Sequence, residues 1–180
     1  MSLPTLGRLE SLPALDHPDL LAPPVLAALR GWEHGSELAV VRIDPEVADT
    51  AAMSEAYDLG MDTGANCVVV GGRRDGQERV AACLVRADTR ADVNNVVKRT
   101  LDVRKCSFLP VDRAVEESGM DYGGITPVGL PAAWRLLVDA RVLDIEVAVI
   151  GSGVRRSKLL LPGHLAGALP GAEVVEGLAG

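Results

Sequence analysis

The chain has 180 residues, of which 48% are hydrophobic, and this length suits one domain with a core large enough to fold alone. Its formal net charge of −7 argues against broad, nonspecific binding along nucleic acid, because proteins that contact a long stretch of phosphates are usually basic. No apolar run approaches the ~20 residues that span a bilayer and the start lacks the features of a signal peptide, so we expect a cytoplasmic protein without a membrane segment.

The cysteines and histidines follow no metal-binding or disulfide pattern. Three cysteines are an odd number, each lies among apolar neighbours, and no pair has the CxxC spacing. We interpret them as reduced core residues. The three histidines are too scattered for a zinc site, and we expect neither a metal nor another cofactor. These residues are Cys67, Cys83, Cys106, His17, His34 and His164.

Residues 1–35 are rich in Leu and Pro, and we interpret them as an N-terminal extension that packs on a domain formed by residues 36–180. One short helix fits between residues 20 and 32. Pro24 lies near the start of this helix, where the missing N–H of a proline costs nothing.

The next elements are a strand, a helix and a hairpin. The β-branched run at residues 37–43 predicts the strand, and residues 46–59 predict a helix that Gly60 closes. Two apolar runs, at residues 65–70 and 78–86, predict paired strands joined by an exposed, charged tip.

The second half of the chain continues this mixture of short elements. A helix is expected over residues 90–101, with Asp88 or Thr89 as its cap. Strands and helices interleave without a strict βαβ rhythm, which predicts a single α+β domain with a mixed, strongly curved β-sheet flanked by helices. The remaining predicted elements are a strand at 107–109, a helix at 112–118 stopped by Gly119, strands at 134–139, 146–150 and 158–161, a helix near 162–169 and a strand at 173–175.

The most informative segment is residues 119–131, GMDYGGITPVGLP, with four glycines and two prolines. Glycine lets a ligand approach the main chain closely, and proline holds a loop still. Such a loop presents backbone N–H groups in a fixed array, which suits a carbonyl oxygen or a terminal ribose. The alternative interpretation is a well-made turn between two strands.

Three segments occur in an order that matches a known family. GGITPVG at residues 123–129 places Gly123 and Pro127 in a Gly-x-x-x-Pro motif. The other two are VNNVVKRTL at 93–101 with the basic turn Arg104-Lys105, and Val138-Asp139 followed by VAVIGSG at 147–153 and Arg155-Arg156. Over roughly residues 37–178 the chain therefore resembles the YbaK/prolyl-tRNA synthetase-associated domain family of aminoacyl-tRNA deacylases.

The resemblance implies a free-standing trans-editing enzyme, which hydrolyses the ester between an amino acid and the 3′-terminal ribose of a mischarged tRNA. It implies that the glycine-rich loop holds the terminal adenosine and the ester carbonyl. Positioning and backbone donors on the developing oxyanion can supply much of the acceleration, and no Ser–His or Cys–His pair is evident. The implied catalytic residues are Asn66, Gly123, Gly124, Ile125, Thr126 and Pro127, and the implied substrate-binding residues are Gly129, Asp139, Ser152 and Gly153.

One position departs from the family's pattern. The family usually carries a lysine at the start of the strand that begins near Ala65, and the matching residue here is Asn66. Residues 48–71 contain no Lys or Arg, so a shift of the alignment does not recover the charge. Charge-assisted hydrogen bonds are roughly twice as strong as neutral ones. A second hypothesis is therefore a catalytically weak or inactive module of the same fold, which binds a nucleotide or a tRNA end.

Three of these positions also have a purely structural interpretation. Asn66 can be a polar residue at a strand edge, Asp139 can end a strand, and Gly151–Gly153 can form a hairpin turn. A third hypothesis for the whole chain is a protein-interaction domain whose contact surface is the extension at residues 1–35.

Basic residues near the family segments predict a local RNA contact. If their side chains converge, they form one positive patch suited to a few phosphates at the 3′ end of an aminoacyl-tRNA. If they point apart, they are ordinary solvated charges. An aminoacyl-tRNA synthetase is a candidate partner, and the amino acid and the oligomeric state, a homodimer included, stay open. The basic residues are Lys98, Arg104, Lys105, Arg155, Arg156 and Lys158.

Overall fold

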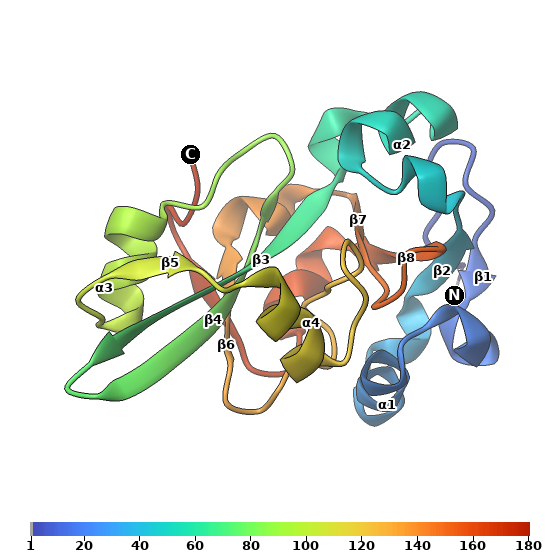
Figure 1. Cartoon of the computed structure of the whole chain (residues 1–180). Coiled ribbons are helices and arrows are strands. Elements are labelled where there is room, and N and C mark those ends of the chain that lie inside the picture. Colours follow the sequence, from blue (N-terminus) through green and yellow to red (C-terminus); the bar gives the residue numbers. More distant parts are fainter. Residues whose placement is uncertain (1) are drawn as a thin grey trace.

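Nine strands divide between two sheets in the computed structural model, which describes residues 2–180 (Figure 1). One sheet has the order β1-β2-β8-β7 and is antiparallel throughout. The other has the order β5-β3-β4-β6-β9 and is mixed, because β6 pairs in parallel with both β4 and β9. The strands are β1 Leu12–Pro13, β2 Ala39–Arg42, β3 Ala65–Arg74, β4 Gln77–Arg86, β5 Cys106–Phe108, β6 Arg135–Asp139, β7 Val147–Gly151, β8 Ser157–Pro162 and β9 Ala172–Val175.

Short helices connect these strands and confirm the predicted α+β class. A parallel bridge between Gly64 and Val149 joins the two sheets, so the predicted curved sheet is divided at this point. No helix within residues 2–180 is long and apolar enough to cross a bilayer. The α-helices are α1 Pro23–Gly31, α2 Thr50–Tyr57, α3 Lys98–Leu101 and α4 Val111–Ser118. A π turn spans Val93–Val97, and 3-10 helices span Ala14–Asp16, Pro18–Leu20, Gly35–Glu37, Pro45–Val47, Met61–Thr63, Ala140–Asp144 and Gly163–Ala168.

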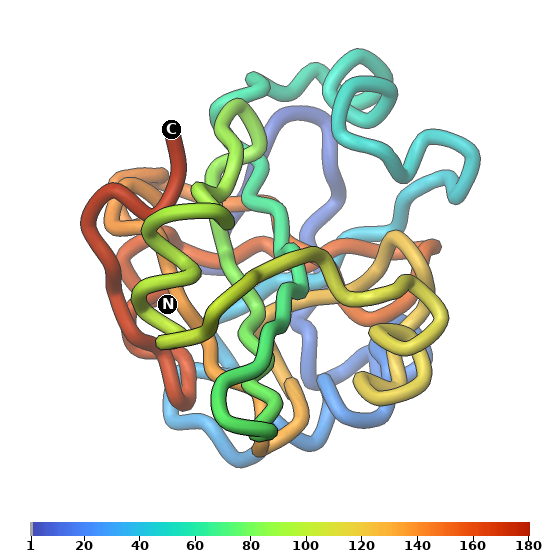
Figure 2. Tube along the Cα trace, turned by 60° about the vertical axis from the view of Figure 1, so that its left-hand side comes forward, coloured from blue at the N-terminus to red at the C-terminus, as the bar shows by residue number. Residues whose placement is uncertain are grey.

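The β3–β4 hairpin runs through the middle of the molecule (Figure 2). Its turn consists of Asp75 and Gly76, whose φ angles of 52° and 77° are the positive values that a two-residue hairpin turn needs. The tip is therefore shorter than predicted, because Gly71 and Gly72 continue β3. A Cβ on Gly72 would lie 2.1 Å from the carbonyl oxygen of Lys105, so only glycine fits where the two segments cross.

Two predicted helices have other boundaries. The helix predicted over residues 46–59 is divided into the 3-10 helix Pro45–Val47 and α2, which ends at Tyr57. Asp58, in place of Gly60, is the cap of α2 and adopts the left-handed conformation with φ of 58°. The helix predicted over 90–101 begins three residues later, at Val93. Its cap is Asp92, whose carboxylate accepts the N–H of Asn95 at 3.2 Å.

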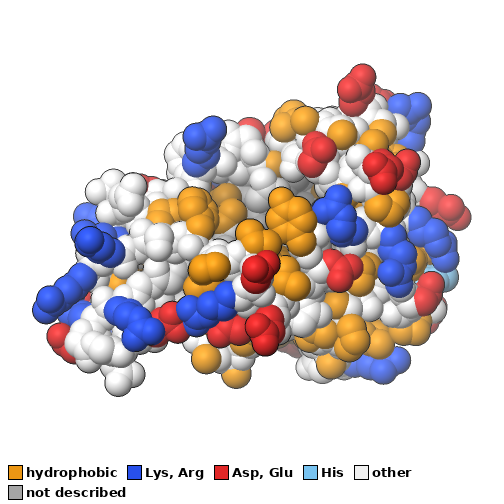
Figure 3. Space-filling view, in the orientation of Figure 1, with side chains coloured by type: hydrophobic (Ala, Val, Ile, Leu, Met, Phe, Trp, Pro, Cys, Tyr) orange, Lys and Arg blue, Asp and Glu red, His pale blue; other side chains and the backbone are white. Residues whose placement is uncertain are grey.

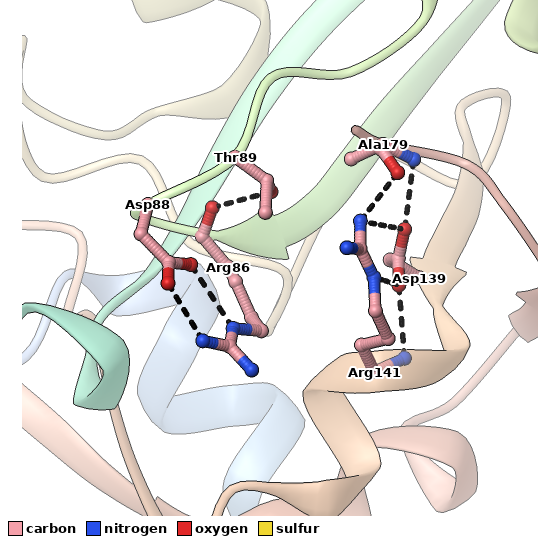
Figure 4. A network of polar contacts seen from close by, with 6 residues as sticks. All are labelled: Arg86, Asp88, Thr89, Asp139, Arg141 and Ala179. Carbon is pink, nitrogen blue, oxygen red and sulfur yellow. Dashed lines mark hydrogen bonds and ion pairs between the residues drawn. The ribbon is translucent and has the colours of Figure 1, made fainter.

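The caps predicted for that helix have other partners (Figure 4). Asp88 accepts two hydrogen bonds from the guanidinium of Arg86, at 3.0 and 2.6 Å. The hydroxyl of Thr89 donates to the Arg86 carbonyl at 2.7 Å. Both residues thus close the turn that leaves β4.

The largest cluster of buried apolar side chains includes part of the N-terminal extension. α1 buries Val25 and Leu29 in this cluster, and Pro23 and Pro24 occupy its first turn, as the missing N–H of proline allows. α1 also packs behind the glycine-rich loop. A Cβ on Gly129, which has φ of 80°, would lie 2.4 Å from the Pro24 carbonyl oxygen. The extension therefore supports the loop from the side away from solvent.

Candidate functional site

A cavity of about 470 Å³ opens where the two sheets meet, beside the glycine-rich loop. Gly64 and Val149, which bridge the sheets, both line it. Most of the lining is apolar, with a few polar side chains among it, which is typical of sites for small molecules. The apolar side chains include Met53, Leu59, Val69, Leu109 and Ile150, and the polar ones are Thr50, Ser54, Thr63, Asn66, Tyr122 and Lys158.

The first half of the glycine-rich loop forms one wall of this cavity. Two backbone hydrogen bonds hold it to the β7–β8 turn: Gly153 N–H donates to the Gly124 carbonyl at 2.7 Å, and Asp121 N–H donates to the Gly153 carbonyl at 2.8 Å. A third bond closes the loop on itself, from Gly124 N–H to the Asp121 carbonyl at 2.9 Å. A Cβ on Gly124 would lie 2.9 Å from backbone atoms of Gly153 and Val154. Only glycine fits there, and the hydrogen bonds fix the loop as the sequence predicts.

Three of the predicted catalytic residues, Asn66, Gly123 and Ile125, line the cavity. Asn66 is the second residue of β3, and its side-chain oxygen lies 3.5 Å from the Thr50 hydroxyl at the start of α2. Within residues 2–180, the N–H groups of Gly123 and Ile125 donate to no protein acceptor. Neither donor is therefore engaged in holding the loop in place.

The other predicted loop residues lie behind this wall. Gly124 packs on the β7–β8 turn, and Pro127 and Gly129 line a second cavity of about 290 Å³ beside Trp32. Thr126 is fully buried, and its hydroxyl has no hydrogen-bond partner among residues 2–180. None of these four residues lines the larger cavity, so their contribution to it is through the shape of the loop.

Asp139, predicted to bind substrate, is fully engaged in structural contacts (Figure 4). Its side chain is 1% exposed and accepts hydrogen bonds from Arg141 N at 2.9 Å, Arg141 Nε at 3.2 Å and Ala179 N at 2.7 Å. It therefore caps the 3-10 helix Ala140–Asp144 and holds the C-terminal segment. It does not line the cavity, and this geometry favours the structural interpretation of Asp139.

Ser152 and Gly153 connect the β7–β8 turn to α1 and to the loop. The Ser152 hydroxyl lies 2.7 Å from that of Ser157, and the Ser152 carbonyl accepts the N–H of Ala22 at 3.2 Å. A Cβ on Gly153, which has φ of 88°, would lie 2.4 Å from the Cβ of Ala22. Both residues therefore support the wall of the cavity from outside.

The six predicted RNA-binding residues lie in two groups. Lys98 belongs to α3 and Arg104 and Lys105 follow it, at the opposite end of the molecule from β8 in Figure 1. Arg104 is 3.9 Å from Asp75 at the tip of the β3–β4 hairpin. Figure 3 shows blue side chains near both ends of this face and hydrophobic ones between them. A single convergent patch is therefore absent from residues 2–180.

The second basic group adjoins the cavity. Arg155 donates to the carbonyls of Tyr122 at 3.2 Å and Pro45 at 3.3 Å, and Arg156 donates to the carbonyl of Asp19. Lys158 lies in β8 and points its ammonium to the Gly123 carbonyl, 3.4 Å away. Lys158 is the one member of the six that lines the cavity. Burial, together with the charge of Arg155, lowers its pKa.

Exposed apolar side chains frame the cavity, and sequence reasoning missed them. Phe108 and Tyr122 are each 64% exposed and Val111 is 53% exposed, and all three line the cavity. The guanidinium carbon of Arg155 lies 5.9 Å from the centre of the Tyr122 ring. The sequence offered one signal, which is that aromatic residues are scarce in this chain and one of them, Tyr122, lies within the glycine-rich loop.

Cys67 is the one thiol in the cavity lining. Burial raises its pKa, and the neighbouring Cys83 thiol raises it further. The thiol of Cys67 therefore stays protonated at neutral pH and is not an activated nucleophile. Within residues 2–180, no group of three His, Cys, Asp or Glu side chains is placed to hold a metal ion.

The chain is similar in sequence to one known family and to two known proteins. The model of a family described as an aminoacyl-tRNA editing domain matches residues 44–166. Proline–tRNA ligases of Listeria welshimeri and Listeria monocytogenes are each 34% identical over 76 residues, which is 42% of this chain and 13% of each ligase.

Two solved structures share the fold. The first, titled as a candidate trans-editing enzyme for prolyl tRNA synthetase, has a TM-score of 0.73 and 21% identity, with coverage of 86% of this chain and 94% of that one. The second, a hypothetical protein, has a TM-score of 0.75 and 19% identity, with coverage of 87% and 99%. At such low identity these structures support the fold alone.

Proposed function

The chain belongs to the aminoacyl-tRNA editing domain family, and on this premise we propose that it is a trans-editing deacylase that hydrolyses the ester of a mischarged aminoacyl-tRNA. The observation that carries this proposal is the cavity of about 470 Å³ beside the segment from Tyr122 to Ile125. Its apolar interior suits the side chain of an amino acid, and Tyr122 and Lys158 are polar lining residues at the loop. The implied partners are the 3′ end of the charged tRNA and the synthetase that mischarges it, and we propose that the protein meets them in the cytoplasm.

The proposed reaction needs little from the protein beyond positioning. A water molecule attacks the ester carbon, the bond to the ribose oxygen breaks, and that oxygen leaves with a proton while the second proton goes to solvent. The free N–H groups of Gly123 and Ile125 are candidate donors to the oxyanion that forms. Preorganised donors of this kind stabilise the transition state because they need no reorientation during the reaction.

The terminal adenosine is proposed to bind at the mouth of the cavity. Phe108 and Tyr122 are largely exposed there, and bases of single-stranded nucleic acid stack on aromatic rings. Arg155 lies against Tyr122 and is placed to contact a phosphate. This arrangement agrees with a small, local RNA contact on an acidic protein.

A panel of mischarged tRNAs tests the function directly. We expect the purified protein to cleave at least one aminoacyl ester above the background rate, and Gly124→Ala to abolish the activity because the added Cβ displaces the loop. Gly31→Ala is the matched control, since Gly31 ends α1 with open space around it. Absence of cleavage across the panel by the unaltered protein would contradict the proposal.

The second candidate function is a binding module without turnover, and Asn66 in place of the family's lysine is the observation that favours it. Asn66→Lys separates the two functions. Hydrolysis by the variant with none by the parent would favour the binding module. Hydrolysis by the parent would favour the deacylase.

A further inference from the structure

Lys158 brings a positive charge into the cavity from the sheet opposite Asn66. It lies in β8, where it pairs with Val41 of β2 and Gly151 of β7. Asn66 lies near the start of β3 in the other sheet, and both side chains line the cavity. Gly151 also lines the cavity between β8 and the loop, and a Cβ there would lie 2.6 Å from the Gly124 carbonyl oxygen.

The charge of Lys158 is not neutralised by a protein partner. Of the described residues that line the cavity, Lys158 alone is a cation and none is a carboxylate. Within residues 2–180 Lys158 forms no salt bridge with an Asp or Glu, and the like charge of Arg155 acts against its charged form. An ammonium in this position is unfavourable for folding, because a half-buried charge loses hydration without gaining an ion pair. A charged group without an ion-pair partner in a cleft is a candidate functional residue.

We propose that Lys158 is a catalytic residue, whose ammonium binds the carbonyl oxygen of the substrate ester and stabilises its negative charge in the transition state. The proposal rests on the deacylase function proposed above. Water adds to the ester carbon, the carbonyl π electrons move to the oxygen that Lys158 contacts, and the bond to the ribose oxygen breaks as they return. Lys158 stays protonated throughout and donates a hydrogen bond only. Lys158 in β8 thus supplies the positive charge that a lysine at position 66, in β3, would otherwise supply.

The contact with Gly123 is the competing explanation for Lys158. An ammonium that donates to the Gly123 carbonyl at 3.4 Å could simply hold the loop in place. Moving the charge to the other wall separates the two roles, because a lysine at position 66 would restore a positive charge to the cavity without restoring the contact from β8.

The test is single-turnover hydrolysis of a mischarged tRNA that the parent cleaves. We expect Lys158→Met to lower the rate by about 100-fold, the effect of removing one oxyanion donor, with less effect on tRNA affinity. The double variant Lys158→Met/Asn66→Lys should cleave at least about tenfold faster than Lys158→Met. Arg30→Met, a loss of charge at an exposed position in the last turn of α1 and outside the cavity lining, should cleave at the parent's rate. The melting temperature of Lys158→Met should equal or exceed the parent's, because an unpaired charge is removed.

Each outcome decides the proposal. An unchanged rate for Lys158→Met overturns it and leaves the deacylase function standing. A loss that Asn66→Lys does not recover assigns Lys158 to holding the loop and also overturns it. A parent that cleaves no ester removes the proposed function and, with it, the reaction that Lys158 would serve.

Discussion

At the scale of single residues, the mouth of the cavity depends on two exposed aromatic rings. Phe108 ends β5 and Tyr122 lies in the loop, so the rings come from segments that the sheet and α4 bring together. Large exposed apolar groups at a cavity mouth are unfavourable in water unless a ligand covers them. Their exposure is consistent with a binding role and has no structural explanation within the chain.

Tyr122→Ala is expected to raise the KM for mischarged tRNA and leave kcat nearly unchanged. Loss of one stacked base costs about 1–3 kcal/mol, which corresponds to roughly a fivefold to hundredfold change in KM. Tyr122→Phe keeps the ring and should behave like the parent. Val174→Ala, which truncates an exposed apolar side chain outside the cavity, is the control. Equal KM values for Tyr122→Ala and the parent would contradict stacking of the adenosine on Tyr122.

Asp139→Ala is expected to destabilise the protein without affecting the chemistry. The variant loses the cap of the 3-10 helix Ala140–Asp144 and the bond to Ala179, which together should lower the free energy of unfolding by about 2 kcal/mol. Asp144→Ala, at an exposed position at the end of the same helix, should change it by less than about 0.5 kcal/mol. Urea unfolding measures both. A stable Asp139→Ala variant with a lower rate of deacylation would return Asp139 to the list of substrate-binding residues.

At the scale of elements, ion pairs join neighbouring segments at the surface. Arg135 of β6 donates two hydrogen bonds to Glu173 of β9, at 2.9 and 2.7 Å. Arg113 of α4 holds Glu78 of β4 in the same way, at 2.5 and 2.6 Å. The hydrogen bonds from these arginines hold the pKa values of Glu173 and Glu78 below their usual range.

The pH dependence of stability follows from these lowered pKa values. A carboxylate whose pKa is lower in the folded state stabilises the fold above its unfolded pKa of about 4.3, and this contribution disappears as the pH falls through the folded value. Because Glu173 is 44% exposed, we expect Glu173→Gln to cost no more than about 0.5 kcal/mol at pH 7. At pH 3 the difference from the parent should be smaller. Urea unfolding at the two pH values measures it, and a larger difference at pH 3 would contradict the assignment.

At the scale of the whole molecule, the N-terminal extension is continuous with the core. β1 pairs with β2, and six residues of the extension are buried together with side chains from both sheets: Ala14, Leu20, Leu21, Ala22, Val25 and Leu29. We propose that residues 1–35 and 36–180 fold as one cooperative unit, although the family match begins only at residue 44. The extension then acts as a support for the loop that forms the cavity.

Leu29→Ala should lower the free energy of unfolding by about 2–5 kcal/mol, because Leu29 is fully buried in α1 and its truncation leaves a cavity. Leu26→Ala, at a partly exposed position on the same helix, should cost clearly less. Both variants should unfold in a single transition in thermal or urea experiments. If α1 unfolded in a separate transition from the rest of the chain, the extension would be an independent appendage.

Much of the fold was predictable from local patterns. β-branched runs located the strands near residues 37–43, 65–86 and 146–150, and Gly119 ended α4 as expected. The error at the end of α2 arose because aspartate can take the place expected of glycine. Asp58 adopts the left-handed conformation predicted for Gly60, because Asp also tolerates this region of φ.

The sequence by itself determined the class of the fold, the family and a loop of glycines and prolines, because backbone preferences and hydrophobic periodicity are local properties. Only the tertiary structure decided which side chains share the cavity. Asn66 and Lys158 are far apart in the chain and belong to different sheets, and the pairing of Gly64 with Val149 brings those sheets together. The tertiary structure also decided that Asp139 has a structural role and does not line the cavity. A carboxylate at a strand end accepts hydrogen bonds from whichever N–H groups the fold places beside it, and here these belong to Arg141 and Ala179.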